Sequence, residues 1–185
     1  MLAFPAFAIA FWTRQALAHS GSIWANNYAP LEKAISNPAF LIGFFWFLSA
    51  FAFEIQRLVP GANEIYPAID PKFHADLFML NFVLSAFVAE RIAHRKNWPV
   101  AGWPAYITTP VLLLAALANL TNDHTLMGPL SWAFWLLGLT AHGVLLYRLD
   151  RRNAVGWFAW MHAMGVWVLL ILLINILRYA INQAD

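Results

Sequence analysis

The 185-residue sequence contains no cysteine and few charged residues, and both absences narrow what the protein can be. Without cysteine it forms no disulfide, no thiolate metal site and no cysteine nucleophile. Only 11% of its residues are charged, against about 25% in soluble domains. Hydrophobic residues make up 62% of the chain, and 16% are aromatic. This composition indicates an integral membrane protein whose first partner is the lipid bilayer.

Catalytic and nucleic-acid motifs are also missing. The sequence has no glycine-rich phosphate loop, no H-E-x-x-H helix and no basic-aromatic segment, so we expect no metal site and no nucleic-acid partner. Ser49, Ser85 and Ser131 each lack a histidine–carboxylate arrangement nearby in the sequence. The sequence therefore favours a protein that is not an enzyme.

Long apolar runs predict the fold. A bilayer core about 30 Å thick is crossed by about 20 residues of helix. Arg14 interrupts the first apolar run, so residues 1–18 form either a sixth span or an interfacial helix. We predict an all-α, polytopic transmembrane helical bundle, with a single domain over 1–185. Its five clear spans are 38–59, 73–92, 100–120, 129–147 and 156–177.

Prolines divide the predicted spans. Pro30 and Pro38, together with several asparagines, predict a polar connection over residues 19–37 that has room for one short helix. Pro110 lies inside the third span, after Thr108 and Thr109. Proline removes a backbone hydrogen bond that neighbouring hydroxyls partly replace, so this run predicts a kink.

Basic residues predict the orientation. They gather in the turns 91–97 and 148–153, which are two spans apart and therefore face the same side. The positive-inside rule makes that side the cytoplasm, and the C-terminus then faces outward. Three tryptophans near the inner interface and one near the outer agree with this orientation: Trp98, Trp103, Trp157 and Trp132.

One stretch resembles a known family. The run Leu137-Gly138-Leu139-Thr140-Ala141-His142, the turn 148–152 and the segments Gly156–Trp160 and Met161-His162-Ala163 lie within residues 136–173. This stretch is similar to part of a large family of uncharacterised bacterial multi-pass membrane proteins. Members are usually longer, so the chain would correspond to a segment or a reduced relative. The resemblance implies a bacterial inner-membrane location and transfers no catalytic residue.

His142 and His162 flank the 148–153 turn at matching distances, one in each of the last two spans. Antiparallel neighbours joined by a short turn would hold both rings at one depth, about 10 Å into the bilayer. Neutral imidazole is an axial ligand of haem iron, so the pair could clamp one haem b. The alternatives are a proton relay and histidines that only hydrogen-bond between helices, and we expect no cofactor.

Glu54, His74 and Asp76 form a second candidate set near the predicted outer surface. Intramembrane carboxylates are candidates for a substrate or ion site. An interfacial layer of salt bridges is the competing interpretation. Glu90, near the inner interface, is expected to pair locally or with Arg95 or Arg148.

Three functions remain open. The first is a non-catalytic accessory or scaffolding subunit that packs against other membrane subunits. The second is a transporter or channel-like unit that uses Glu54 and Asp76. Three features support the transporter hypothesis: these carboxylates, the helix break expected at Pro110, and a faint repeat in which Asn119 and Asn175 lie 56 positions apart. The third is a haem-binding redox subunit that uses His142 and His162.

Overall fold

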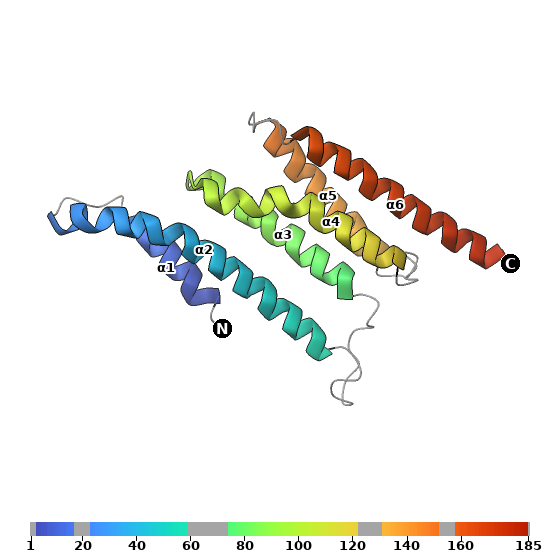
Figure 1. The fold of residues 1–185 in the computed structure, drawn as a ribbon, viewed down its shortest axis with the longest axis horizontal. Coiled ribbons are helices and arrows are strands. Elements are labelled where there is room, and N and C mark those ends of the chain that lie inside the picture. Colours follow the sequence, from blue (N-terminus) through green and yellow to red (C-terminus); the bar gives the residue numbers. More distant parts are fainter. Residues whose placement is uncertain (1–2, 17–22, 59–73, 122–130, 152–157, 185) are drawn as a thin grey trace. The chain divides into compact units, whose positions relative to one another are not determined.

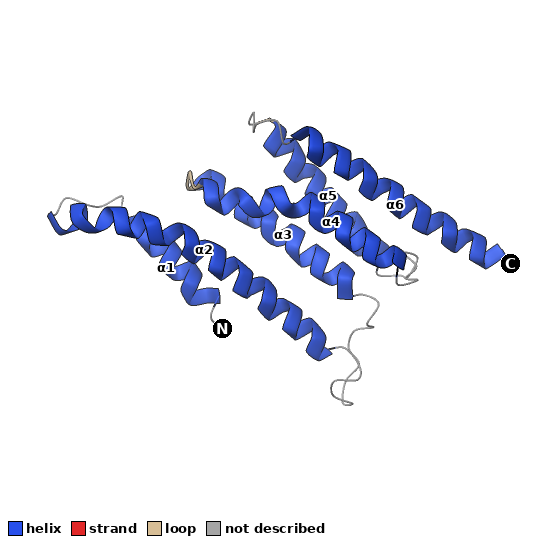
Figure 2. Ribbon diagram, viewed as in Figure 1, coloured by secondary structure: helices blue, strands red, loops and turns tan. Residues whose placement is uncertain are grey.

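The computed structural model describes residues 3–16, 23–58, 74–121, 131–151 and 158–184. These residues are helical apart from short turns, and no strand occurs among them (Figures 1 and 2). The elements are α1 (Ala3–Ala16), α2 (Ile23–Leu58), α3 (His74–Arg95), the 3-10 helix η2 (Pro99–Gly102), α4 (Trp103–Thr121), α5 (Ser131–Asp150) and α6 (Phe158–Ala184).

Four of the described helical segments are long and apolar enough to cross a membrane, which confirms the all-α membrane class. They are Ala34–Arg57, His74–Arg95, Pro99–Leu120 and Ala159–Asn182. The prediction of five apolar spans was too high. Residues 131–147 of the predicted span 129–147 belong to α5, whereas residues 129 and 130 lie outside the described part of the chain. Thr140, His142 and Arg148 lower the apolar character of α5. Residues Ala3–Thr13 form a shorter apolar helix.

The predicted polar connection over 19–37 was wrong for residues 23–37. Helix α2 begins at Ile23 and continues through Pro30 and Pro38 to Leu58. Each proline removes one backbone bond, and the remaining bonds of a 36-residue helix hold the two sides in register. Proline therefore did not mark the helix boundary here.

The chain divides into two compact units, Met1–Arg57 and Leu58–Asp185. The prediction of a single domain stays a prediction, and we describe each unit by itself. In the first unit α1 packs on α2 through aromatic rings: the Phe7 and Phe40 centroids lie 5.8 Å apart, and those of Phe40 and Phe44 6.2 Å apart. A Cβ on Gly43 would lie 3.2 Å from Ala6 and Phe7, so this glycine permits the close approach.

In the second unit the packing does not follow the chain order. Helix α3 packs against α4 and α5, and α4 packs against α6. The prediction of a close α5–α6 hairpin therefore named the wrong main neighbours. Pairs between side chains at both ends show that α3 and α5 run in the same direction, with α4 and α6 antiparallel to them.

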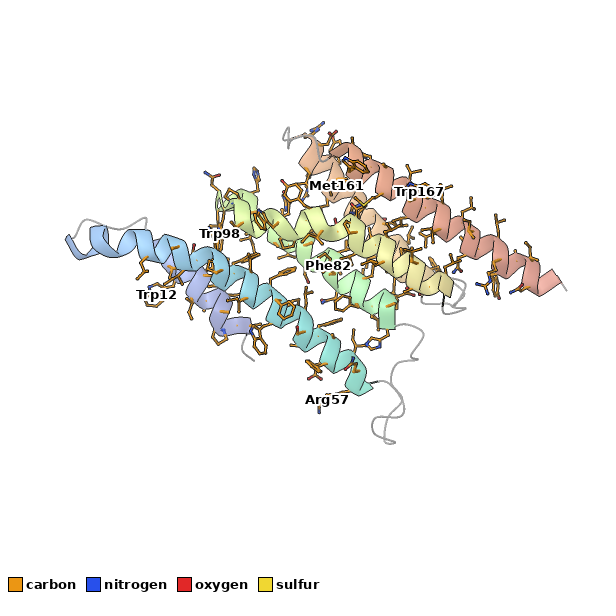
Figure 3. All side chains as sticks on the ribbon, in the orientation of Figure 1. Trp12, Arg57, Phe82, Trp98, Met161 and Trp167 are labelled. Atoms are coloured by element: carbon orange, nitrogen blue, oxygen red, sulfur yellow. The ribbon has the colours of Figure 1, made fainter. Side chains whose placement is uncertain are left out.

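Two apolar clusters fill this unit. The larger takes residues from all four helices: Met79, Val83, Leu112, Ala115, Ala116, Trp135, Val168 and Leu172. The smaller joins Ala105, Leu145, Leu149 and Met161. Met161 is 2% exposed, whereas Trp167, on the same helix, is 61% exposed (Figure 3). Helix α6 thus has an inward face in the bundle and an outward apolar face.

Candidate functional site

Buried polar side chains of the second unit gather at three levels along α3 and α5. Asp76 marks one end, His142 the middle and Glu90 the other end. Fourteen residues separate the two carboxylates on α3, which corresponds to about 21 Å of helix. The larger apolar cluster lies between the Asp76 and His142 levels, and the smaller one lies beyond His142.

Asp76 is bound by three neutral donors. The Asn119 Nδ2 and Trp135 Nε1 atoms donate to its Oδ1 at 2.6 and 2.9 Å, and the Ser131 hydroxyl donates to Oδ2. The side chain is 2% exposed, and no described basic side chain forms an ion pair with it. One carboxylate therefore joins α3 to α4 and α5.

The local sequence explains this arrangement. Asp76 lies in the first turn of α3, Ser131 begins α5, and Trp135 follows Ser131 by one turn on the same face. Asn119 lies near the end of α4, which is antiparallel to α3. The four side chains therefore meet at one end of the bundle, where Asn119 hydrogen-bonds from α4 to α3.

His142 lies at the middle level and is enclosed by α4. Its Nδ1 lies 3.0 Å from the Thr108 Oγ1, and its Nε2 lies 3.3 Å from the Thr109 Oγ1. Both hydroxyls precede Pro110, which lies inside a helix that continues to Thr121. The threonines expected to support a proline kink therefore bind a histidine of another helix.

Hydrogen-bond counting fixes the tautomer of His142. The Thr108 hydroxyl already donates to the Ala105 carbonyl at 2.7 Å, so its oxygen accepts from Nδ1–H. The neutral ring then has an unprotonated Nε2, to which the Thr109 hydroxyl donates. Both ring nitrogens are satisfied by α4, as expected of a histidine that holds helices together.

The two histidines differ in their surroundings. His142 is buried, whereas the His162 side chain is exposed. Ligation of haem by His142 would require one ring nitrogen to leave a threonine hydroxyl. Haem binding stays a prediction that this arrangement does not favour, and no group of three or more metal-ligating side chains occurs among the described residues.

Three glycines near the histidines, Gly138, Gly143 and Gly165, differ in how closely other atoms approach them. A Cβ on Gly138 would lie 2.9 Å from the Met79 sulfur, so this glycine lets α5 approach α3. Added Cβ atoms on Gly143 and Gly165 would meet nothing within 4 Å. Of these three glycines, Gly138 is the one that packing requires.

Glu90 and Arg148 form the third level. The Arg148 Nη1 lies 3.8 Å from the Glu90 Oε2, which confirms Arg148 among the expected partners of Glu90. The Arg148 guanidinium also lies 4.8 Å from the centre of the Phe87 ring, in cation–π geometry. The described basic residues of both turns lie at this end: Arg91, Arg95, Lys96, Arg148 and Arg151.

The predicted set of Glu54, His74 and Asp76 takes residues from both units and stays a prediction. Glu54 belongs to the first unit, where it pairs with Arg57 at 3.3 Å and is largely exposed. His74 begins α3 and is partly buried. Within the second unit Asp76 instead has Asn119, Ser131 and Trp135, a set that the sequence alone did not assemble.

No family model, curated protein or solved structure matches this chain. The resemblance over residues 136–173 therefore stays a prediction.

Proposed function

We propose that this chain is a non-catalytic scaffolding subunit that packs within a protein complex of the bacterial inner membrane. The observation that carries the proposal is the pairing of the buried polar groups. Asp76, His142 and Glu90 each bind side chains of a neighbouring helix, and apolar clusters separate the Asp76 and His142 levels. These groups hold the helices together, and their partners leave them little capacity for substrate.

The outer surface supports a role among other membrane helices. Large apolar side chains are exposed along α6, including Trp160, Val166, Trp167, Leu173 and Leu177. Gly143 and Gly165 have open space beside them, and small residues let a second helix approach closely. Lipid or partner helices cover such faces.

We propose a topology from the directions of the helices and the positions of the basic turns. Helix α5 runs beside α3 from the Asp76 level to the Glu90 level, and we propose that it lies in the same layer although it is less apolar than the four candidate spans. The basic turns 91–97 and 148–153 face the cytoplasm under the positive-inside rule. The C-terminus, at the end of α6, then faces outward. Cysteines introduced singly at Lys96 and Ala184 of the full chain test this by labelling from one side: Lys96→Cys should react only from the cytoplasm.

Purification in mild detergent tests the scaffolding role. The tagged full chain should carry other membrane proteins in fixed stoichiometry, and tagging such a protein should return this chain. Gly165→Leu should weaken that association and leave the chain's own unfolding temperature unchanged, because the added side chain has room within the chain. Gly143→Leu is the matched substitution on α5. A chain that always returns alone as a monomer contradicts the proposal.

A transporter that uses Asp76 is the second candidate. It is favoured by one observation: a buried carboxylate held only by neutral donors, without a basic partner among the described residues. Such groups mark ion and proton pathways in membranes. Flux measurements in vesicles compare wild type with Asp76→Asn and Glu54→Gln. Equal flux in all three removes this candidate.

A further inference from the structure

We propose that Asp76 is a reversible proton-binding site, because the same three neighbours satisfy its carboxyl group in both protonation states. The proposal goes beyond the scaffolding role and does not depend on it. It rests on which atoms surround each carboxylate oxygen.

The Oδ1 atom faces two obligate donors. The Asn119 amide nitrogen and the Trp135 indole nitrogen carry hydrogens and accept none. A carboxyl oxygen has two lone pairs and accepts both hydrogen bonds whether or not the other oxygen carries a proton. The two donors therefore stay satisfied when Asp76 changes charge, and they fix which oxygen remains unprotonated.

The Oδ2 atom faces the Ser131 hydroxyl, which both donates and accepts. With Asp76 ionised, the hydroxyl donates to Oδ2. With Asp76 protonated, hydronium gives up one proton and becomes water, an O–H bond forms at Oδ2, the Ser131 hydrogen rotates away, and Oδ2–H donates to the Ser131 oxygen. The Asn119 and Trp135 donors keep their acceptor at Oδ1 throughout.

The neighbours favour a proton over a metal cation. Two of the three contacts to Asp76 are N–H groups, which repel a cation, whereas sodium would require several oxygen ligands. Charged groups at this end are few in the described part of the unit. They are His74 on α3 and, on α6, Arg178, which donates to the Leu120 carbonyl at 3.1 Å. The titratable residues of α4 and α5 lie farther along these helices: Tyr106, His142, Tyr147, Arg148 and Asp150.

The indole N–H of Trp135 reports the charge of Asp76 directly. The full chain, reconstituted in nanodiscs with ¹⁵N-labelled tryptophan, gives indole resonances, and the one lost in Trp135→Phe belongs to Trp135. We expect this resonance to move with pH in a single-proton step. Asp76→Asn should abolish the step, because its amide mimics the protonated carboxyl: the carbonyl accepts both N–H groups, and the amide donates to Ser131.

Controls separate this site from other titrations. Glu54→Gln alters an exposed carboxylate and should leave the step unchanged. Ser131→Ala removes the one described partner of Asp76 that can both donate and accept a hydrogen bond. It should shift the proton affinity of Asp76 about tenfold, because hydrogen bonds to the two charge states differ in strength. The other indole resonances report whether each variant is folded. A Trp135 resonance that is constant with pH, a step that survives Asp76→Asn, or a midpoint set by sodium at fixed ionic strength overturns the proposal.

Discussion

The two ends of α3 each bury a carboxylate, and each carboxylate is accommodated differently. Asp76, 2% exposed, accepts hydrogen bonds from three neutral groups at short distances. Glu90, 1% exposed, lies 3.8 Å from an arginine that also contacts an aromatic ring. The first arrangement tolerates a change of charge on the acid, whereas the second requires opposite charges on both partners.

The difference shows how α5 is positioned. Neutral hydrogen bonds need precise geometry, so Ser131 and Trp135 fix the start of α5 against α3. The longer ion pair at Arg148 holds the other end with more freedom. We therefore expect substitutions at the Asp76 end to cost more than those at the Glu90 end.

Asp76→Ala should have the largest effect. It leaves the donors of Asn119, Ser131 and Trp135 buried without an acceptor, and each stranded donor costs about 1–3 kcal/mol. We expect the free energy of unfolding to fall by about 3 kcal/mol or more, measured by denaturant titration in detergent micelles. Asp76→Asn should cost much less, and Glu54→Ala about 0.5 kcal/mol. Equal losses for Asp76→Ala and Glu54→Ala would contradict the packing described.

Arg148→Ala should have the next largest effect. It removes the partner of a buried carboxylate and the contact with the Phe87 ring. Arg148 is partly exposed, so water compensates some of the loss, and we expect a cost of about 2 kcal/mol. Glu90→Gln, which removes the charge but keeps the shape, should cost less in the same assay. If Arg148→Ala lowers the free energy of unfolding more than Asp76→Ala does, the expected order of the two ends of α3 is wrong.

The middle level gives a smaller effect. Thr109→Val keeps the volume of the side chain and removes the donor to the His142 Nε2, which should cost about 1 kcal/mol. Thr108→Val removes an acceptor and a bond to Ala105 and should cost slightly more.

The visible spectrum of the same preparations from haem-replete cells tests haem binding. We expect no Soret band, and a band lost in His142→Ala would revive the haem hypothesis.

Gly138→Ala should have the smallest destabilising effect. The new methyl group meets the end of the flexible Met79 side chain, which yields at a cost of about 1 kcal/mol. Gly143→Ala, on the same helix with no atom nearby, is the matched control and should be neutral or slightly stabilising. Equal effects at both positions would mean that α3 and α5 do not approach at Gly138.

Composition and apolar runs were enough to predict the helical membrane class, because a bilayer imposes helix length directly. The apolar runs predicted α5 as a clear span, but its polar residues make it less apolar than the other four. The side chains that bind those polar residues cannot be identified from the sequence. The prolines led to a wrong prediction for residues 23–37, because α2 continues through Pro30 and Pro38. The Glu90–Arg148 pair was among the predicted possibilities, because both residues lie near the same predicted surface.

The Asp76 site was only partly predictable. Its carboxylate was visible as an intramembrane acid, but its donors lie 43, 55 and 59 positions away. Pairing them requires knowing that α5 packs beside α3 and not mainly beside α6. The one available signal was Ser131 and Trp135, polar groups one turn apart at the start of an apolar run. For His142, two adjacent threonines before Pro110 gave a comparable signal.

The placement of α5 beside α3 also bears on biosynthesis. His142 and Arg148 make the transfer of α5 from the translocon into lipid less favourable. The partners that relieve this cost, on α3 and α4, precede α5 in the chain and are synthesised first. When α5 leaves the ribosome, the helices that satisfy its polar side chains have therefore already been synthesised.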